Sequence, residues 1–207
     1  MTKQARPAIL SDFPDADFSL IAIATSQGGL KAISEILSVL PADFPAAITI
    51  VQHLSAKSHS YMAEILTGRT ALRVKPAEDG ERLRPGTVYT PVPDKHLLVK
   101  ADKTLYLSDE PKVNFVRPAA NRMFASVAAS LRTRAIAVVL TGNQSDGALG
   151  VVAIKKHGGF VIAQDEASCE CFSMPKAAIA TGKVDLILPL SAIAGTLLDL
   201  VISTKAA

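Results

Sequence analysis

The chain has 207 residues, 49% of them hydrophobic, which is enough apolar material for one sizeable core. The net charge is only +3 and 5% of the residues are aromatic, a composition that argues against nucleic-acid binding. No apolar stretch reaches the roughly eighteen residues of a membrane span, and no secretory leader pattern occurs at the N-terminus. We therefore expect no membrane insertion and a cytoplasmic location.

Apolar runs alternate with stretches at helical spacing through the first part of the chain. The pattern predicts strands at 20–24, 47–51 and 72–76, and helices at 30–40 and 58–66. Residues 78–107 differ in character, because turn pairs such as Asp79-Gly80 and Pro85-Gly86 separate short alternating runs. These runs lie at 87–90, 97–100 and 104–107. They predict an antiparallel insertion of hairpins.

Alternation resumes in the second half. It predicts strands at 136–140, 160–163 and 185–188, and helices at 118–131, at 146–157, from 175 onward and at 190–201. Strands this uniformly apolar are buried on both faces. The fold class predicted is therefore α/β, a doubly wound and mainly parallel sheet flanked by helices, with the antiparallel hairpin insertion near residues 78–107. We expect one domain, residues 20–207, after a flexible N-terminal extension, residues 1–19.

Three polar residues follow predicted strands closely: Ser26, His53 and Asp146. In an open parallel sheet the crevice lies beyond the carboxyl ends of the strands, so all three could meet at one rim. A serine hydroxyl becomes a useful nucleophile when an imidazole removes its proton, and a carboxylate orients the imidazole. Gly28-Gly29 opens a helix directly after Ser26 and frees backbone N–H groups suited to an oxyanion.

Each of these residues also has a common structural role. A serine before two glycines is typical of a helix N-cap, a histidine at a strand end is often only packed, and Asp146 fits a turn or N-cap. The other histidines look like surface or loop positions: His59, His96 and His157. A nucleotide- or phosphate-binding module is a further alternative, although G-x-G-x-x-G and G-K-[ST] are both absent.

Cys169 and Cys171 are the only cysteines of the chain. A single C-x-C pair is poor evidence for zinc, and it lacks the C-x-x-C spacing of redox motifs. We expect two reduced structural cysteines and no metal or cofactor.

Eight short runs in order along the chain carry a resemblance. They are I-A-T-S-Q-G-G-L (23–30), I-V-Q-H (50–53), E-D-G-E-R-L-R-P-G (78–86), P-D-K-H (93–96), V-N-F-V-R-P (113–118), V-L-T-G-N-Q-S-D-G-A-L-G (139–150), A-Q-D-E-A-S-C (163–169) and F-S-M-P (172–175). Together they resemble the catalytic domain of chemotaxis response-regulator protein-glutamate methylesterases. The matching order and spacing make the resemblance specific.

The resemblance implies a serine hydrolase that demethylates glutamate methyl esters on the cytoplasmic helices of chemoreceptors in chemosensory adaptation. Some members of the family also deamidate receptor glutamines. The resemblance gives the catalytic roles to Ser26, His53 and Asp146, and it implies no cofactor. It gives oxyanion binding and substrate positioning to three further residues: Gln27, Gly28 and Asn143. The alternative is a catalytically inactive receptor-binding scaffold of the same fold.

Three positions depart from the family pattern. Gln27 stands where threonine is usual, Asn143 where methionine is usual, and Asn121 where an R-P-S-x-D pattern has its aspartate. We expect these changes to affect substrate preference and not the triad. Family members also carry a receiver domain, for which residues 1–19 are too few. Regulation is then expected from a separate regulatory protein, from expression level or from nothing, unless the domain was cut from a longer polypeptide.

Overall fold

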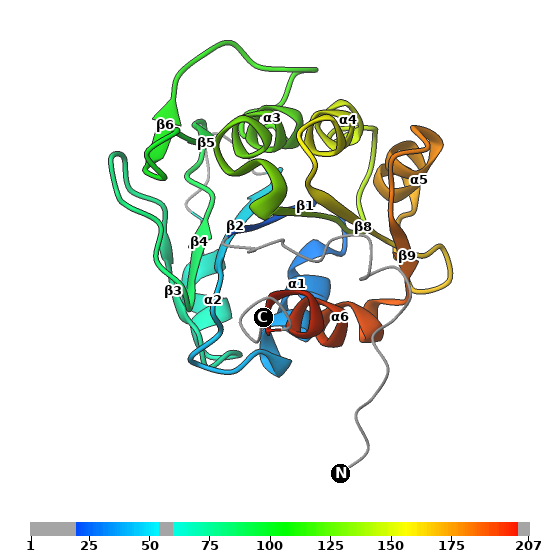
Figure 1. Ribbon diagram of the computed structural model, residues 1–207, viewed down its shortest axis with the longest axis horizontal. Helices are drawn as coiled ribbons and strands as arrows, with labels where there is room; N and C mark the ends of the chain where they lie inside the picture. The colour runs from blue at the N-terminus through cyan, green and yellow to red at the C-terminus, as the bar shows by residue number, and fades with distance from the viewer. Residues whose placement is uncertain (1–19, 54–59, 203–207) are drawn as a thin grey trace.

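The computed structural model describes residues 20–53 and 60–202. The predicted flexible extension at 1–19 and the first residues of the helix predicted at 58–66 lie outside this range. A parallel sheet of seven strands, in the order β3-β4-β2-β1-β7-β8-β9, forms the centre (Figure 1). Its strands are β1 (Leu20–Thr25), β2 (Ala47–Gln52), β3 (Arg73–Pro76), β4 (Thr87–Thr90), β7 (Ala135–Val139), β8 (Phe160–Gln164) and β9 (Leu186–Leu188).

Helices cover both faces of this sheet. They are α1 (Gly29–Val39), α2 (Met62–Thr67), α3 (Ala120–Leu131), α4 (Ala148–Lys156), α5 (Ser173–Ala180) and α6 (Leu190–Ile202), with a 3₁₀ turn at Arg132–Arg134. Figure 1 shows α1 and α6 on one face, and α3, α4 and α5 on the other. The predicted class, a doubly wound parallel sheet flanked by helices, is confirmed.

Strand β1 shows why the two faces close over separate apolar clusters. Its side chains alternate across the sheet, as those of any strand must. Ile21 and Ile23 pack into the cluster beneath α1 and α6. Leu20, Ala22 and Ala24 pack into the cluster beneath α3 and α4. All five are buried, so both faces of the strand are apolar up to its last residue, Thr25, which is also buried.

The predicted hairpin insertion is confirmed in its second part only. Strands β5 (His96–Val99) and β6 (Leu105–Ser108) form an antiparallel pair. The run at 87–90 was predicted as part of the same insertion, and this is wrong: it is β4, which pairs in parallel with β2 and β3. The physical reason is burial, because all four residues of β4 are buried and the strand fills the sheet beside β2.

The topology identifies the crevice of the sheet. The helix after β1 is α1, which lies on one face, whereas the helix after β7 is α4, which lies on the other (Figure 1). Loops therefore diverge where β1 and β7 end side by side, and open sheets of this class bind ligands at such a point.

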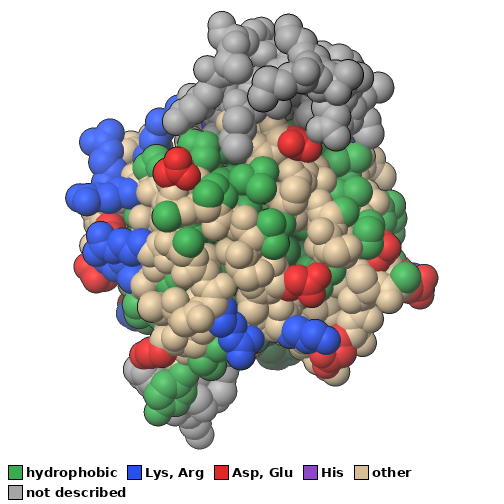
Figure 2. Space-filling view, turned by 90° about the horizontal axis from the view of Figure 1, so that it is seen from below, with side chains coloured by type: hydrophobic (Ala, Val, Ile, Leu, Met, Phe, Trp, Pro, Cys, Tyr) green, Lys and Arg blue, Asp and Glu red, His purple; other side chains and the backbone are tan. Residues whose placement is uncertain are grey.

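The surface shows no continuous band of one charge on the face in view. In Figure 2, Lys and Arg side chains gather at the left, the side on which β3 lies in Figure 1, and acidic side chains are dispersed. Within residues 20–53 and 60–202 no helix is both long and apolar enough to cross a bilayer.

Candidate active site

The ends of β1 and β2 bring Ser26 and His53 together. The two strands pair in parallel with Thr25 opposite Gln52, so Ser26 and His53 are the next residues in the same register. Neighbouring strands lie about 4.8 Å apart, which places the two backbones side by side at the rim of the sheet. In the described residues the Ser26 hydroxyl and the His53 ring make no hydrogen bond; such bonds are often long before substrate binds.

His53 is bound to Asp146. Its Nε2 atom lies 2.9 Å from Asp146 Oδ2, and the two side chains are 15% and 2% exposed. Because Nε2 faces the carboxylate, Nδ1 is the ring nitrogen left to act on a neighbouring hydroxyl. The structure thus joins two of the three predicted catalytic residues by a direct bond and places the third at the adjacent strand end.

The carboxylate of Asp146 is held by three donors. Besides His53, the backbone N–H of Ala120 donates to Oδ2 at 2.6 Å and that of Asn121 donates to Oδ1 at 2.9 Å. Burial acts to raise the pKa of Asp146, but the hydrogen bonds from His53, Asn121 and Ala120 outweigh it, and the pKa lies below the usual carboxyl value. Asp146 therefore stays ionised and fixes the orientation of His53.

Asp146 and Asn121 cap two helices reciprocally. Asp146 lies just before α4 and accepts the first N–H groups of α3. Asn121, in the first turn of α3, accepts through Oδ1 the N–H groups of Gly147 at 3.0 Å and Gly150 at 2.9 Å, at the start of α4. The N-cap alternative for Asp146 is thus real, but the helix it caps is α3. The cap on α4 comes from the amide oxygen of Asn121.

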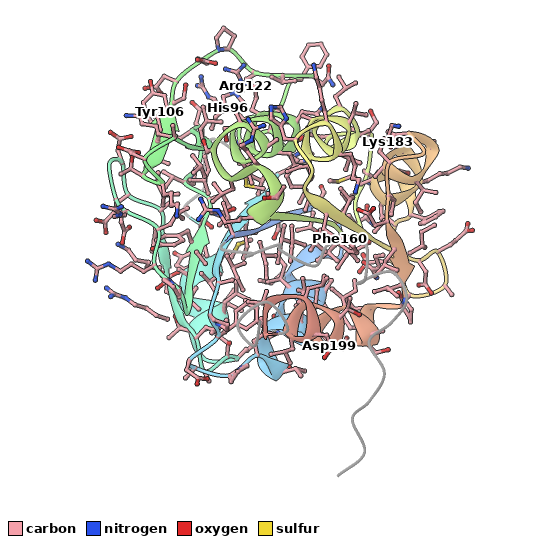
Figure 3. All side chains as sticks on the ribbon, in the orientation of Figure 1. His96, Tyr106, Arg122, Phe160, Lys183 and Asp199 are labelled. Carbon is pink, nitrogen blue, oxygen red and sulfur yellow. The ribbon has the colours of Figure 1, made fainter. Side chains whose placement is uncertain are left out.

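His96 was predicted at a surface or loop position, and this is wrong: it is fully buried. Its Nε2–H donates to the carbonyl of Pro111 at 3.1 Å, and its Nδ1 accepts the N–H of Ala119 at 3.2 Å. Burial lowers the pKa of His96 below the usual histidine value. The neutral ring therefore supports the turn that leads to Ala120, one of the donors to Asp146. Figure 3 shows His96 beside α3, near Arg122.

Short backbone contacts fix the loop that carries Ser26. The N–H of Ser26 and the hydroxyl of Thr25 both donate to the carbonyl of Thr141, at 3.1 and 2.7 Å. A β-carbon on Gly142 would lie 2.9 Å from the Ser26 nitrogen, so only glycine fits there. The N-cap of α1 is Gly28, with φ of 77°, and no side chain caps this helix. Ser26 is therefore not the N-cap that its sequence context suggested.

Backbone donors around Ser26 are open. The N–H of Gly142 donates to the carbonyl of Cys171 at 2.8 Å and is not available. The N–H groups of Gln27, Gly28 and Asn143 make no hydrogen bond within residues 20–53 and 60–202. These are the three positions predicted for oxyanion binding and substrate positioning, and they come from the loops after β1 and β7.

The side chains of Gln27 and Asn143 bind each other. Asn143 Nδ2 donates to Gln27 Oε1 at 2.7 Å across the rim of the site. The thiol of Cys171 donates to Asn143 Oδ1 at 2.8 Å, and Gln27 Nε2 lies 3.5 Å from a carboxylate oxygen of Glu170. No sequence pattern indicated this network, because its members lie in three loops that are far apart along the chain.

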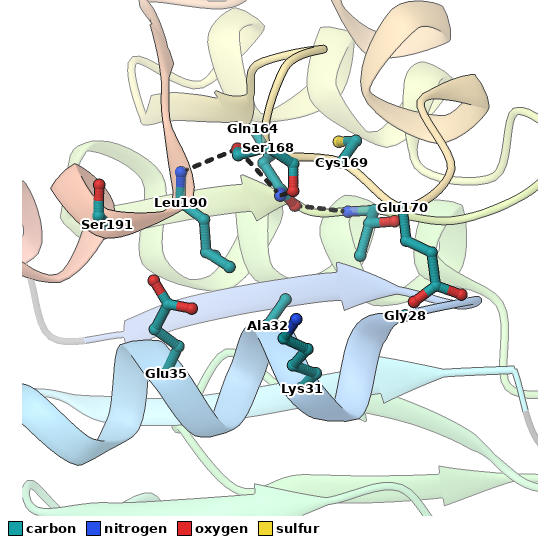
Figure 4. Close-up of a pocket in the computed structure, with 11 residues that line it drawn as sticks. Gly28, Lys31, Ala32, Glu35, Gln164, Ser168, Cys169, Glu170, Leu190 and Ser191 are labelled. Atoms are coloured by element: carbon teal, nitrogen blue, oxygen red, sulfur yellow. Dashed lines mark hydrogen bonds between the residues drawn. The ribbon is translucent and has the colours of Figure 1, made fainter.

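A cavity of about 390 Å³ adjoins the Ser26 loop on the side of α1 and α6. Gly28 and Thr141 belong to its wall, and Lys31, Glu35 and Glu170 bring charged groups to it (Figure 4). His53 and Asp146 lie on the other side of β1, toward α3. This cavity therefore lies beside the loop that carries Ser26 and not over the His–Asp pair.

Neither cysteine is in a disulfide, as expected. Burial raises the pKa of the Cys169 thiol to about 11, so it stays protonated at neutral pH. In the described part of the chain, no three His, Cys, Asp or Glu residues are grouped in a way that could hold a metal ion.

Comparison with known proteins decides the family. The model of the CheB methylesterase family matches residues 21–197, nearly the whole described chain. The chain belongs to this family. A crystal structure of the CheB methylesterase catalytic domain of Thermotoga maritima superposes with a TM-score of 0.86 and 38% identity. That match covers 88% of this chain and 98% of the other.

Curated relatives of the chain are named as protein-glutamate methylesterases. A protein-glutamate methylesterase/protein-glutamine glutaminase of Burkholderia pseudomallei strain 1710b is 44% identical over 175 residues, which are 83% of this chain and 48% of that protein. The protein-glutamate methylesterase FrzG of Myxococcus xanthus is 40% identical over 186 residues, 90% of this chain and 56% of that protein. The chain thus spans about half the length of these CheB-type relatives. A putative member from Leptospira interrogans serogroup Icterohaemorrhagiae serovar copenhageni is 38% identical, and the match covers 92% of it.

Proposed function

We propose that this domain is a serine esterase that hydrolyses methyl esters of glutamate side chains on chemoreceptors, with deamidation of receptor glutamines as a second reaction. The observation that carries the proposal is the rim where β1 and β2 end. It sets Ser26 in register with His53, and His53 is bound to a buried, ionised Asp146 at 2.9 Å. The names of the relatives point to the same two reactions.

The mechanism follows from this geometry. Ser26 Oγ attacks the γ-carbonyl carbon of the ester while His53 Nδ1 takes the hydroxyl proton, and Asp146 stabilises the imidazolium. Open N–H groups at Gln27, Gly28 and Asn143 stand where they can bind the tetrahedral oxyanion. His53 returns the proton to the leaving methanol. Water then attacks the acyl-enzyme with His53 again as base, which releases glutamate and restores Ser26. From a glutamine the leaving group is ammonia.

The substrate is a protein segment in this proposal. We assign the partner as the methylated cytoplasmic helices of chemoreceptors, and the location as the cytoplasm, where those helices lie. We propose a separate regulatory protein as a further partner. A catalytically inactive receptor-binding scaffold is the alternative that the experiment must separate.

The test compares Ser26→Ala with Ser38→Ala, a matched serine exposed at the far end of α1. We expect wild type and Ser38→Ala to release methanol from methylated receptor and to react with a fluorophosphonate probe. Loss of a nucleophile typically costs about 10⁶-fold in turnover, so Ser26→Ala should do neither. Near-normal methanol release by Ser26→Ala would remove Ser26 from its role. A folded wild type that binds receptor but neither labels nor releases methanol would favour the inactive scaffold.

A further inference from the structure

The two residues that depart from the family pattern next to the nucleophile contact each other. Gln27 follows Ser26 in the loop after β1, and Asn143 lies in the loop after β7. Their side-chain amides are joined at 2.7 Å, although 116 positions separate them in the chain. The same two residues carry backbone N–H groups that make no hydrogen bond to any other residue that the structure describes. This side-chain hydrogen bond joins the two loops in addition to the bonds that Thr141 makes to the Ser26 N–H and to the Gln27 carbonyl.

A third loop completes the connection. Cys171, in the loop after β8, donates its thiol hydrogen to Asn143 Oδ1 at 2.8 Å. The backbone of the same residue is bound twice to the β7 loop: its N–H donates to Thr141 Oγ1 at 2.9 Å, and its carbonyl accepts the N–H of Gly142 at 2.8 Å. We call the side chains of Gln27, Asn143 and Cys171 the clasp.

The clasp uses both ends of the Asn143 amide. Its nitrogen donates to Gln27 and its oxygen accepts from Cys171, so the amide orientation is fixed from two sides. The residues usual in the family at positions 27 and 143 have fewer side-chain groups that can form these hydrogen bonds. Methionine at 143 has no donor and only a weak acceptor, and threonine at 27 carries a shorter side chain than glutamine. Each of the two departures supplies the partner that the other needs.

We propose that Gln27 and Asn143 are positioning residues, and that the clasp holds the backbone N–H groups of the β1 and β7 loops at the separation that the tetrahedral oxyanion requires. This inference rests on the proposed esterase function. Donors held in place before the reaction stabilise the oxyanion without reorganisation, and a displacement of about 1 Å can cost 10²-fold in rate. The clasp side chains act on each other and not on the substrate, so they affect turnover more than substrate binding.

The test is a double-mutant cycle with Gln27→Ala, Asn143→Ala and the combined variant. Turnover of p-nitrophenyl acetate and of methylated receptor is measured for each. We expect each single variant to lower kcat about tenfold and to leave KM within about twofold. The combined variant should be no worse than about tenfold, because either change alone already breaks the same bond. Independent losses that multiply to about 100-fold, or a rise in KM at constant kcat, would overturn the inference.

A second pair of variants covers the third loop. Cys171→Ala removes the donor to Asn143 and should lower kcat about threefold, the scale of one weak hydrogen bond. Ser38→Ala, at the exposed serine at the far end of α1, should leave kcat at the wild-type value. Equal effects of these two changes would contradict a role for the clasp.

A rescue variant provides a second test in case an alanine variant is poorly folded. Gln27→Thr with Asn143→Met restores the pair that is usual in the family, and it should be more active than Asn143→Met alone. Equal activity of the two would count against the clasp. A wild type that hydrolyses neither substrate would overturn the proposed function and this inference together. An active wild type with multiplicative alanine effects would overturn the inference alone.

Discussion

The two halves of the site are built differently. On the α3 side, Asp146 is buried and accepts hydrogen bonds from His53 and from two N–H groups of α3, and these bonds lower its pKa. On the rim around Ser26, Gln27 and Asn143 are exposed and bind each other. The buried half keeps the family's residues at His53 and Asp146, and the exposed half carries two of the departures. A buried charged group needs partners that satisfy its charge, so few other residues fit at its position. At an exposed rim, water can satisfy polar groups, so several combinations of side chains fit.

The first prediction concerns the buried carboxylate and has the largest effect. Asp146→Asn should lower kcat by about 10⁴-fold, because His53 loses the group that sets its tautomer. The pKa of Asp146 is lowered in the folded state, so its ionised form stabilises the folded protein. This stabilisation is fully present above the carboxyl pKa of the unfolded chain, which is about 4. It is lost as the pH falls through the lower pKa that Asp146 has in the folded protein. Urea unfolding from pH 2.5 to 7 should therefore show a flatter acid limb in Asp146→Asn.

Asp43→Asn is the matched control, since Asp43 is exposed and precedes β2, at the end of that strand opposite to His53. It should change neither turnover nor the acid limb. An unchanged kcat in Asp146→Asn would contradict the role of Asp146 in orienting His53.

The second prediction tests the close approach at Gly142. A β-carbon there would meet Met174 and the backbone of Ser26, so Gly142→Ala must displace one of them. We expect a loss of roughly 10²-fold in kcat, the cost of a small misplacement, and about 1–3 kcal/mol in the free energy of unfolding. Gly195→Ala in α6 is the control, because nothing lies within 4 Å of its new carbon. Equal behaviour of the two variants would show that the Ser26 loop tolerates movement.

The third prediction concerns the pH dependence of stability at His96. The buried ring has a lowered pKa; besides burial, Arg122 and Arg117 lower it, while Asp146 and the bond to Pro111 raise it. The unfolded chain therefore binds the proton more readily, and stability present above about pH 6.5 is lost as pH falls below it.

His96→Gln should lose about 1–3 kcal/mol at pH 8, since buried bonds are broken, and should vary less between pH 5 and 7 than wild type. The measurement is urea unfolding across this range. A parallel pH dependence in both proteins would assign the effect to another group.

The fourth and smallest effect concerns the cap on α4. Asn121→Ala removes the acceptor of two N–H groups, so it should cost about 1 kcal/mol and lower Tm by about 2–4 °C. Asn121→Asp keeps the acceptor and restores the residue usual in the family, and its Tm should stay near that of wild type. If Asn121→Asp lowers Tm as much as Asn121→Ala does, repulsion from the nearby Asp146 charge matters more than the cap.

The sequence predicted the sheet well because its central strands, β1, β2, β7 and β8, are apolar on both faces, a pattern typical of a parallel sheet between helices. It failed at residues 87–90, where β-branched residues beside glycine and proline turns look the same in a hairpin edge and in a buried strand. Ser26, His53 and Asp146 could be selected as candidates because each follows a strand that periodicity identifies.

His96 and the clasp could not be found in the same way. The burial of His96 depends on how β5 packs on α3, and the bond between Gln27 and Asn143 depends on two loops meeting. Both are tertiary contacts between distant segments, which periodicity and spacing do not record.

The reciprocal caps have a consequence for how activity is judged from sequence in this family. Asp146 stabilises α3 whether or not the domain hydrolyses anything, because two backbone N–H groups depend on its carboxylate. A related domain that had lost its catalytic activity would still need this aspartate to stabilise its fold. Its survival is therefore weak evidence of catalysis, and the residue at position 26, which caps no helix, is the more telling one to inspect.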